Sequence, residues 1–335
     1  MKIDFTHWPE YFHKLTGRSP TSLEIAEAVK KQSDYYIQNP TKETQWDDPQ
    51  VVIAQFFYYT PLNYLRVQRA KAQGDFFNFF DSTKTVFDYG CGLGAGFLNF
   101  SGADLKIIGH DQSKELYHLL EKLCKILNTD IHLSTELPKE PMVDSLFLAS
   151  FSVTETENPN KMLKILKKFD QQMMVEPATQ ADSRNLQKFR QVLINHDWHI
   201  WAPCTHQDRC PLLENSKTDW CHDKINFELP DWFKSVQEIL PMKLRDLSLS
   251  YLLASKYKLD LPKNYARIIG DIQNEKGKTR LMSCSDSTRM FISALSREKT
   301  ELNLLRGDLV EIPSDVKKLN NEIRTQIPIK LVYRN

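Results

Sequence analysis

Short apolar stretches alternate with amphipathic ones between residues 84 and 195. Five apolar stretches have the length of β-strands: Thr85–Tyr89, Lys106–His110, Asp130–Leu133, Ser145–Ser150 and Met173–Glu176. Three stretches between them have apolar residues at helical spacing: Lys114–Leu127, Asn160–Phe169 and Asp182–Ile194. Strands that alternate with helices are typical of βαβ units, so we predict an α/β fold with a doubly wound, Rossmann-like parallel sheet.

The first 80 residues have a helical pattern. Thr21 and Glu24 have the spacing of a capping box, and the apolar residues of Leu23–Ile37 follow a helical period. A second helical segment, Val51–Ala72, is rich in aromatic residues, and Pro61 predicts a break or a kink within it. We expect its aromatic side chains to be buried.

The alternation stops after residue 200. Trp201–His222 is rich in Cys, His, Pro and Trp and has little periodicity, and a helix is predicted near Pro230–Leu240. Strand-like runs then indicate a small antiparallel β unit: Leu247–Leu253, Ala266–Asp271, Arg280–Cys284, Arg289–Ala294 and Ile327–Tyr333. We therefore expect a helical region over 1–80, an α/β domain over 81–200, and a cysteine-rich segment with a small β domain over 201–335.

The composition is that of an ordinary soluble globular protein, with 41% hydrophobic and 26% charged residues. No stretch approaches the roughly 18 uncharged apolar residues that a membrane helix needs, which excludes an integral membrane protein. The 44 Lys and Arg residues balance the 43 Asp and Glu residues, so any nucleic-acid binding needs a local basic patch. Six cysteines without an export signal indicate a reducing compartment, and we expect a cytoplasmic protein.

Two groups of cations lie on predicted helices: Lys164, Lys167 and Lys168, and Arg184, Lys188 and Arg190. Either group could be a patch that contacts RNA. Charged residues on a helix more often face solvent, so we expect ordinary solvated helix faces.

A glycine-rich turn, DYGCGLGAG, follows the first predicted strand and runs from Asp88 to Gly96. Gly90, Gly92 and Gly94 let the backbone turn tightly and approach a ligand closely. The second predicted strand ends at Asp111, about twenty residues after the first glycine, where a carboxylate can accept both hydroxyls of a ribose. The two features together predict a nucleotide-like cofactor.

The glycine turn leaves the cofactor open. Gly90, Gly92 and Ala95 satisfy the loose dinucleotide fingerprint, so a nicotinamide or another nucleotide is an alternative, as is a purely structural turn. Asp88 favours S-adenosylmethionine, because D-x-G-x-G-x-G resembles motif I of class I S-adenosylmethionine-dependent methyltransferases. In that resemblance Asp111 matches the acid that binds the ribose.

The catalytic residue stays unknown. The methyl group of S-adenosylmethionine is already activated, so a methyltransferase mainly holds the nucleophile in line and excludes water. The fourth strand leads into Ala149–Ser152 without the Asn/Asp-Pro-Pro-aromatic tetrapeptide of amino-group methyltransferases. Pro203-Cys204 resembles the nucleophile pair of RNA cytosine-5 methyltransferases but follows the fifth strand instead of the fourth. We expect three nearby acids to be solvated loop residues: Glu155, Glu157 and Glu176.

A second set of candidate ligands lies in APCTHQDRCPL and DWCH. Cys204, Cys210 and Cys221 occur there with two histidines, and Cys284 follows at a distance. This density favours a metal site over oxidised or merely buried thiols, which remain the alternative. The spacing is wider than the C-x₂₋₄-C of zinc knuckles, so an iron–sulfur cluster suits it at least as well as zinc.

The motifs occur in an order that resembles one family. The chain has DYGCGLGAG, GHD, MVEPATQADSRNLQKFRQVL, APCTHQDRCPL with DWCH, and then ARIIG, Cys284 and RGD (Arg306–Asp308). This order looks like that of the Rsm22 family, methyltransferase-like proteins of the small ribosomal subunit known from bacteria and mitochondria. The resemblance covers residues 50 to 310, and the A-P-C-x-H-x₃-C-P…W-C-H block is its most specific part.

The resemblance implies a class I methyltransferase fold that acts on, or helps to assemble, the small ribosomal subunit. Contacts to S-adenosylmethionine then fall on Asp88, Gly90, Gly92, Gly94 and Asp111. Mitochondrial members bind a four-iron four-sulfur (4Fe-4S) cluster, with zinc as the second choice of metal here. The implied ligands are Cys204, Cys210, Cys221 and Cys284. We expect small-subunit rRNA as the partner, no membrane, and a monomer away from the ribosome.

The chain departs from the family pattern at three positions. Thr205, Ala178 and Asp223 stand where the family usually has Pro, Gly and an aromatic residue, and none of them is a proposed ligand. Methyl transfer is less firmly implied than the fold. The alternative hypothesis is a non-catalytic, metal-stabilised assembly factor that binds RNA through a degenerate methyltransferase fold.

Overall fold

The computed structural model describes residues 3–39, 43–153, 159–286, 288–298, 302–324 and 326–334. The chain forms two compact units, each assembled from three stretches of sequence. Unit 1 comprises Met1–Lys71, Phe80–Val175 and Asn226–Leu247. Unit 2 comprises Ala72–Phe79, Glu176–Ile225 and Ser248–Asn335. Two of the predicted loop acids, Glu155 and Glu157, lie outside the described residues.

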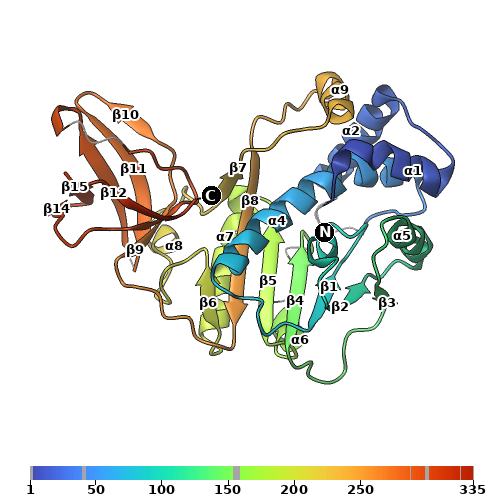
Figure 1. Cartoon of the computed structure of the whole chain (residues 1–335), viewed down its shortest axis with the longest axis horizontal. Coiled ribbons are helices and arrows are strands. Elements are labelled where there is room, and N and C mark those ends of the chain that lie inside the picture. Colours follow the sequence, from blue (N-terminus) through green and yellow to red (C-terminus); the bar gives the residue numbers. More distant parts are fainter. Residues whose placement is uncertain are drawn as a thin grey trace. The chain divides into compact units, whose positions relative to one another are not determined.

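Five parallel strands form the sheet of unit 1, in the order β3-β2-β1-β4-β5 (Figure 1). Their bounds are β1 Thr85–Tyr89, β2 Lys106–His110, β3 His132–Ser134, β4 Ser145–Ser150 and β5 Gln171–Glu176. The central strand β1 pairs with both β2 and β4. The order reverses there, which is where doubly wound sheets bind ligands at the carboxyl ends of their strands. The Rossmann-like sheet is confirmed.

The central strands read as continuous apolar runs because helices cover both faces of such a sheet. All six residues of β5 and the first five of β4 are buried. Helix α5 (Lys114–Ile126) starts at the N-cap Ser113 and buries an apolar stripe of Leu116, Leu120, Leu123 and Cys124. Cys124 is therefore a core residue. Helix α6 spans Pro159–Leu166.

Four helices come before the sheet: α1 Trp8–Thr16, α2 Ser22–Gln38, α3 Pro49–Ala54 and α4 Thr60–Phe76. A short 3₁₀ turn, Phe5–His7, precedes them. The predicted capping box is confirmed at the start of α2. The Thr21 hydroxyl accepts from the Glu24 N–H at 3.2 Å, and the Glu24 carboxylate accepts from the Thr21 N–H at 2.8 Å.

Pro61 widens the helix and does not break it. A π-helical turn, Gln55–Tyr59, joins α3 to α4, and the Thr60 N–H donates to the Gln55 carbonyl. In this wider spacing the next donor would be Pro61, which has no N–H. The Phe56 carbonyl accepts instead from the Trp8 Nε1–H at 2.7 Å. Of the expected break or kink, the break is wrong: the helix continues through a π-helical turn, and the Trp8 indole satisfies the carbonyl that Pro61 leaves open.

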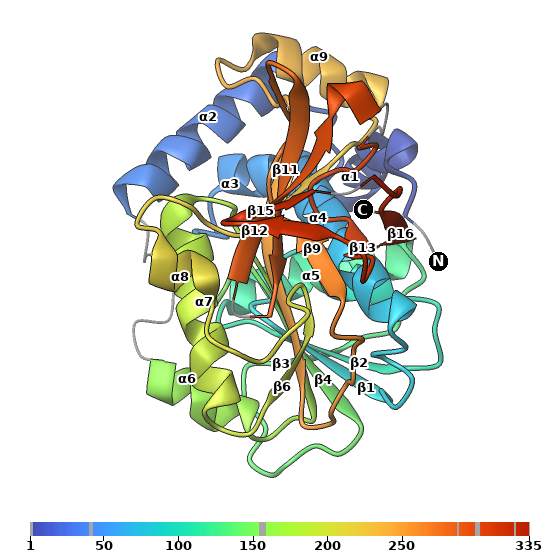
Figure 2. The same ribbon diagram turned by 90° about the vertical axis from the view of Figure 1, so that its left-hand side faces the viewer.

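Unit 2 contains helix α7 (Gln180–Ile194) and helix α8 (Pro211–Asn215), which lie side by side in Figure 2. Strand β8 (Leu247–Ser255) pairs antiparallel with β6 (His199–Ala202) and also pairs with β7 (Asp223–Ile225). Leu247–Leu253 was expected in the small β unit, and this is wrong. The strand is buried along almost its whole length, as a central strand is, and pairs away from that unit.

The C-terminal part of unit 2 is a second sheet, in the order β14-β15-β12-β11-β9-β13-β16, with β10 paired to β11. Its strands are β9 Tyr265–Ile268, β10 Gln273–Glu275, β11 Lys278–Ser285, β12 Thr288–Leu295, β13 Leu309–Glu311, β14 Lys317–Leu319, β15 Glu322–Arg324 and β16 Lys330–Tyr333. It is not wholly antiparallel as expected, because β12 and β15 pair in parallel across a long connection. Its core contains Ala266, Ile268, Leu281, Ile292 and Ile323.

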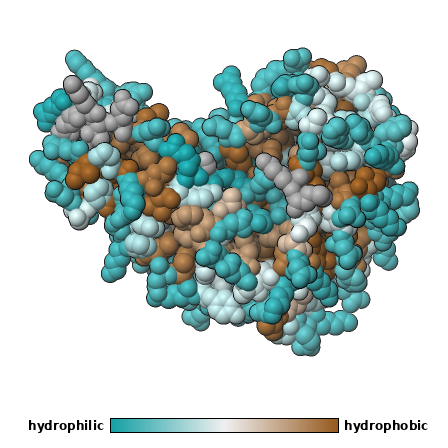
Figure 3. All heavy atoms as spheres, in the orientation of Figure 1, coloured by the Kyte–Doolittle hydropathy of each residue, from teal (hydrophilic) through white to brown (hydrophobic). Residues whose placement is uncertain are grey.

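Helix α9 (Asp231–Ile239) belongs to unit 1 and matches the predicted helix. Among the described residues, no helix is long and apolar enough to cross a membrane. Hydrophilic side chains predominate on the face of the protein shown in Figure 3.

Candidate functional site

The glycine turn leaves the carboxyl end of β1 with a backbone that requires glycine. Gly90, Gly92 and Gly94 have φ values of 66°, 49° and 87°, which side-chain-bearing residues rarely adopt. A Cβ atom on Gly94 would lie 2.5 Å from the ring of Phe97, and one on Gly90 would lie 2.8 Å from Ser152 Cβ. The turn can therefore pack this closely against Phe97 and Ser152 only because these positions are glycine.

Asp88 lies beneath this turn and is fully buried. Its Oδ2 accepts from the Phe97 N–H at 2.8 Å, while Oδ1 has no hydrogen-bond partner within the described part of the chain. Burial raises the pKa of Asp88 to about 7, and the nearby Asp111 carboxylate adds to this rise. A Cβ on Gly96 would lie 2.5 Å from Oδ2, so Gly96 makes room for the carboxyl group.

Asp111 follows β2 and is half-buried beside the turn. Its Oδ2 accepts from the Gly92 N–H at 3.2 Å, and its Oδ1 accepts from the Ser113 N–H at 3.1 Å. The structure thus brings Asp111 to the glycine turn at the carboxyl ends of two neighbouring strands. A half-exposed carboxylate in this place can accept hydroxyl groups from a ribose.

Two residues near this edge were misjudged or missed. Glu176, expected to be solvated, is fully buried, because β5 is buried along its whole length up to this last residue. Trp46 was missed: two of its ring atoms lie 3.7 and 3.8 Å from where a Cβ on Gly92 would be. No motif in the sequence marks Trp46, since its position depends on how α2 and α3 fold.

A second pocket, within unit 2, is lined by all four predicted cysteines: Cys204, Cys210, Cys221 and Cys284. Cys204 follows β6, and Cys210 is the residue that precedes α8. Cys221 comes just before β7, and Cys284 lies on β11. His206 and His222 also line the pocket. Four segments of the chain therefore meet here.

Three of the four thiols in this pocket resist ionisation in the absence of a cation. Burial raises the pKa of Cys210, Cys221 and Cys284, and the neighbouring thiols raise each of them further. Cys221 is affected by all three of the other cysteines. Such a group can hold several thiolates only if a bound cation compensates their charge.

Arg190 supplies one positive charge at this pocket. Its side chain is buried, and its Nε donates to the Cys204 Sγ at 3.1 Å. Its Nη1 and Nη2 donate to the carbonyls of Asp208 and His206 at 2.8 and 2.7 Å. Arg190 was expected on a solvated helix face, which is wrong, because this side of α7 packs against the cysteine loop.

Another buried arginine joins three motifs that are far apart in the sequence. Arg267, from ARIIG, donates from Nε to the Pro203 carbonyl at 2.9 Å. Its Nη1 donates to the Gly307 carbonyl of RGD at 2.7 Å. Pro203 directly precedes Cys204, so Arg267 fixes the start of the cysteine loop.

In the part of the chain that the structure describes, no three His, Cys, Asp or Glu side chains are placed to hold a metal ion. A zinc ion needs all its ligands within about 2.3 Å of one point. The four thiols share a pocket without this convergence. The iron–sulfur cluster and zinc both remain predictions.

A family model supplies the comparison that decides the family. The model described as "Mitochondrial small ribosomal subunit Rsm22" matches residues 113–302, which is more than half of the chain. The chain belongs to the Rsm22 family. The match includes all four cysteines of the pocket and both buried arginines, whereas Asp88, the glycine turn and Asp111 precede it. No curated protein is significantly similar to the chain.

Solved structures of methyltransferases are similar to this Rsm22-family chain at low scores. The plantazolicin methyltransferase BpumL in complex with SAH is 13% identical, with 69% of this chain and 98% of that chain covered and a TM-score of 0.41. The magnesium protoporphyrin IX methyltransferase of Synechocystis is 9% identical, with 69% and 97% covered and a TM-score of 0.35. A SAM-dependent methyltransferase of Aquifex aeolicus is 22% identical, with 31% and 63% covered and a TM-score of 0.27. The assignment to the Rsm22 family does not depend on these structures.

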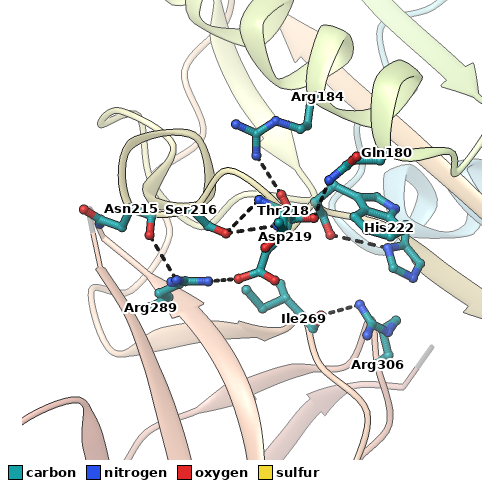
Figure 4. Close-up of polar contacts among 11 residues, drawn as sticks. Gln180, Arg184, Asn215, Ser216, Thr218, Asp219, His222, Ile269, Arg289 and Arg306 are labelled. Atoms are coloured by element: carbon teal, nitrogen blue, oxygen red, sulfur yellow. Dashed lines mark hydrogen bonds and ion pairs between the residues drawn. The ribbon is translucent and has the colours of Figure 1, made fainter.

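The segment that carries Cys221 is held by side chains from α7 and from β12 (Figure 4). From α7, Arg184 donates to the Asp219 carbonyl at 2.8 Å and Gln180 donates to the Thr218 carbonyl at 2.7 Å. From β12, Arg289 forms an ion pair with the Asp219 carboxylate. Arg184 is thus partly solvated, as expected, and also contacts this segment.

Proposed function

We propose that the chain is an S-adenosylmethionine-dependent methyltransferase whose substrate is RNA of the small ribosomal subunit. One observation carries the proposal: Asp111 and the glycine turn above Asp88 meet at the carboxyl ends of β1 and β2. The family description, which names the small ribosomal subunit, supports the substrate. That description also names the mitochondrion, so the cytoplasmic location remains a prediction, as does the monomeric state.

The residues present fit S-adenosylmethionine. The cofactor supplies an activated methyl group, so this chain needs to bind the cofactor, orient the substrate and exclude water. Asp111 would accept the ribose hydroxyls, while Gly90, Gly92 and Gly94 keep the backbone close to the ligand. Asp88 holds the turn in shape through the Phe97 N–H.

Asp111→Ala is expected to weaken S-adenosylmethionine binding by at least tenfold. The variant loses a charged acceptor, whose hydrogen bonds are worth about 1.5–3 kcal/mol each. The measurement is isothermal titration of the purified protein with S-adenosylmethionine. Asp104→Ala, an exposed acid before β2, is the matched control and should bind as the wild type does.

Methyl transfer itself is tested with labelled S-adenosylmethionine and small-subunit particles from cells that lack the protein. Label in the RNA, absent with Asp111→Ala, is the expected result. A wild-type protein that does not bind the cofactor would overturn the proposal.

We also propose that Cys204, Cys210, Cys221 and Cys284 hold a four-iron four-sulfur cluster. Four cysteines from four segments line this one pocket, and four thiolates are the ligand set that such a cluster takes. Bound there, the cluster would link four segments of unit 2 and compensate the charge of the thiolates.

Cys210→Ser is expected to lose iron and to loosen unit 2 while the five parallel strands stay folded. Metal binding is coupled to the folding of the segments that hold the ligands. Iron, acid-labile sulfide and zinc are measured on protein purified without oxygen, and limited proteolysis follows cleavage after Trp201. Cys124→Ser makes the same change at a buried cysteine of α5, outside the pocket, and should keep its iron. Unchanged protection after Trp201 in Cys210→Ser would contradict the prediction.

A non-catalytic assembly factor is the second candidate function. The family match includes the cysteine pocket but not the glycine turn, which favours a role that depends on unit 2. Under this hypothesis Asp111→Ala still co-sediments with small-subunit particles and still supports their assembly, whereas Cys210→Ser does neither.

A further inference from the structure

One face of the C-terminal sheet carries a row of cations across neighbouring strands. Arg280 of β11 is in register with Ser293 of β12, Ser293 with Arg324 of β15, and Arg324 with Lys317 of β14. Residues in register on adjacent strands project from the same face. The row spans three strand spacings, which is roughly 14 Å. Lys278, two residues before Arg280, lies on the same face.

The other face of these strands is the core of the sheet. Leu281, Ile292 and Ile323 alternate with the cationic positions and are buried. The cations therefore project from the opposite face, on which Ser293, in register between Arg280 and Arg324, is itself buried. We call Lys278, Arg280, Phe291, Lys317 and Arg324 the basic face.

An aromatic platform lies within the basic face. The guanidinium carbon of Arg280 lies 4.0 Å from the ring centroid of Phe291, within the range of a cation–π contact. The Arg280 side chain is 25% exposed, and Phe291 is half-buried. Unpaired RNA bases stack on aromatic rings and on arginine planes of this kind.

The basic face keeps an excess of positive charge after its own ion pairs are formed. Glu275 pairs with Arg280 at 2.6 Å, and Glu322 pairs with Lys278 and Arg324 at 2.8 and 2.7 Å. Among the described residues of these strands, the two carboxylates of Glu275 and Glu322 thus face the four cations of the basic face. Lys317 is exposed. The chain as a whole has a net charge of only +1, so this excess is a local feature.

We propose that the basic face binds single-stranded RNA, with a base on the Arg280–Phe291 stack and phosphates at Lys317 and Arg324. This inference rests on the proposed function, in which RNA is the substrate, and adds where the RNA is held. An acidic peptide would satisfy the cations but would leave the stacking platform unused, so the chemistry favours RNA.

The test measures the fluorescence anisotropy of a fluorescein-labelled 15-nucleotide polyuridylate with the full chain between 50 and 300 mM KCl. Lys317→Gln with Arg324→Gln should weaken binding by about tenfold at 100 mM KCl and reduce the salt slope by about 1.4, since each cation contributes about 0.7 for single strands. Arg280→Lys, which keeps the charge but loses the planar group, should weaken binding at least fivefold with the slope unchanged. Circular dichroism checks that each variant is folded.

Lys263→Gln is the matched control, because it removes an exposed lysine that precedes β9 and lies outside the basic face. It should bind as the wild type does. If Lys317→Gln with Arg324→Gln also binds as the wild type does, the basic face is wrong and the proposed function stands. If the wild type does not bind the polyuridylate, the inference is overturned, whereas the RNA substrate is tested separately by the labelling of small-subunit particles. Competition by polyglutamate as effective as that by RNA would show an acidic-protein site and overturn the inference.

Discussion

Arg190→Met is expected to lower the free energy of unfolding of unit 2 by about 3–6 kcal/mol. The variant leaves the buried His206 carbonyl, the partly buried Asp208 carbonyl and the partly buried Cys204 Sγ without their donor. A buried acceptor left unsatisfied costs about 1–3 kcal/mol, and a partly buried one costs less because water can reach it. Methionine fills a similar volume, so the loss of donors, not a cavity, causes the effect. The stability of Arg190→Lys should lie between those of the wild type and Arg190→Met, since one ammonium group cannot reach three divergent acceptors.

The measurement is urea unfolding monitored by tryptophan fluorescence, on protein as purified and after treatment with a chelator. Lys188→Met on the same helix is the matched control, because Lys188 is exposed and its replacement should change stability little. If Arg190→Met and Lys188→Met unfold at the same urea concentration, Arg190 does not hold the cysteine loop.

The large expected effect of Arg190 bears on how the cysteine pocket forms. Arg190 and Arg267 bond to backbone carbonyls on either side of Cys204, so the loop has a defined course before any metal binds. A preformed site loses less conformational freedom when it takes up a ligand. A cluster would then stabilise a pocket that the two arginines already shape.

The parallel sheet was predictable because its signal is local. β1, β2 and β4 begin and end where the apolar runs do. The glycines of the turn predict its backbone conformation, because glycine tolerates positive φ. The short strands β10, β14 and β15 were missed. Each has three residues and is stabilised by its neighbours in the sheet more than by its own pattern.

The cysteine pocket was predictable as a set of ligands but not as an environment. The clustering of Cys204, Cys210 and Cys221 signals a site, whereas the buried Arg190 looks like any cation on an amphipathic helix. Its role follows from the packing of α7 against a loop that comes later in the sequence. Trp46 near Gly92 is a similar case, because its position depends on the contact of distant segments.

Asp88→Asn is expected to become more stable relative to the wild type as the pH rises. Burial raises the pKa of Asp88 from 3.8 to about 7 in the folded state. Below pH 3.8 both states of the wild type are protonated. Between pH 3.8 and 7 only the unfolded state loses its proton, so the free energy of unfolding falls by about 1.4 kcal/mol per pH unit, or about 4 kcal/mol in total. Above pH 7 the loss is complete.

Asparagine does not titrate, and its side-chain oxygen can still accept from the Phe97 N–H, so the variant lacks this loss. Between pH 5 and 8 the difference in stability should therefore move by about 3 kcal/mol in favour of Asp88→Asn, measured by urea unfolding without cofactor. Glu24→Gln is the control: hydrogen bonds from Thr21 lower the pKa of Glu24 below 4.5, so its difference should stay constant over this range. A constant difference for Asp88→Asn would show that Asp88 is ionised in the folded protein throughout, with its charge stabilised by the turn. A difference that moves would show that the glycine turn is built on a neutral carboxyl group.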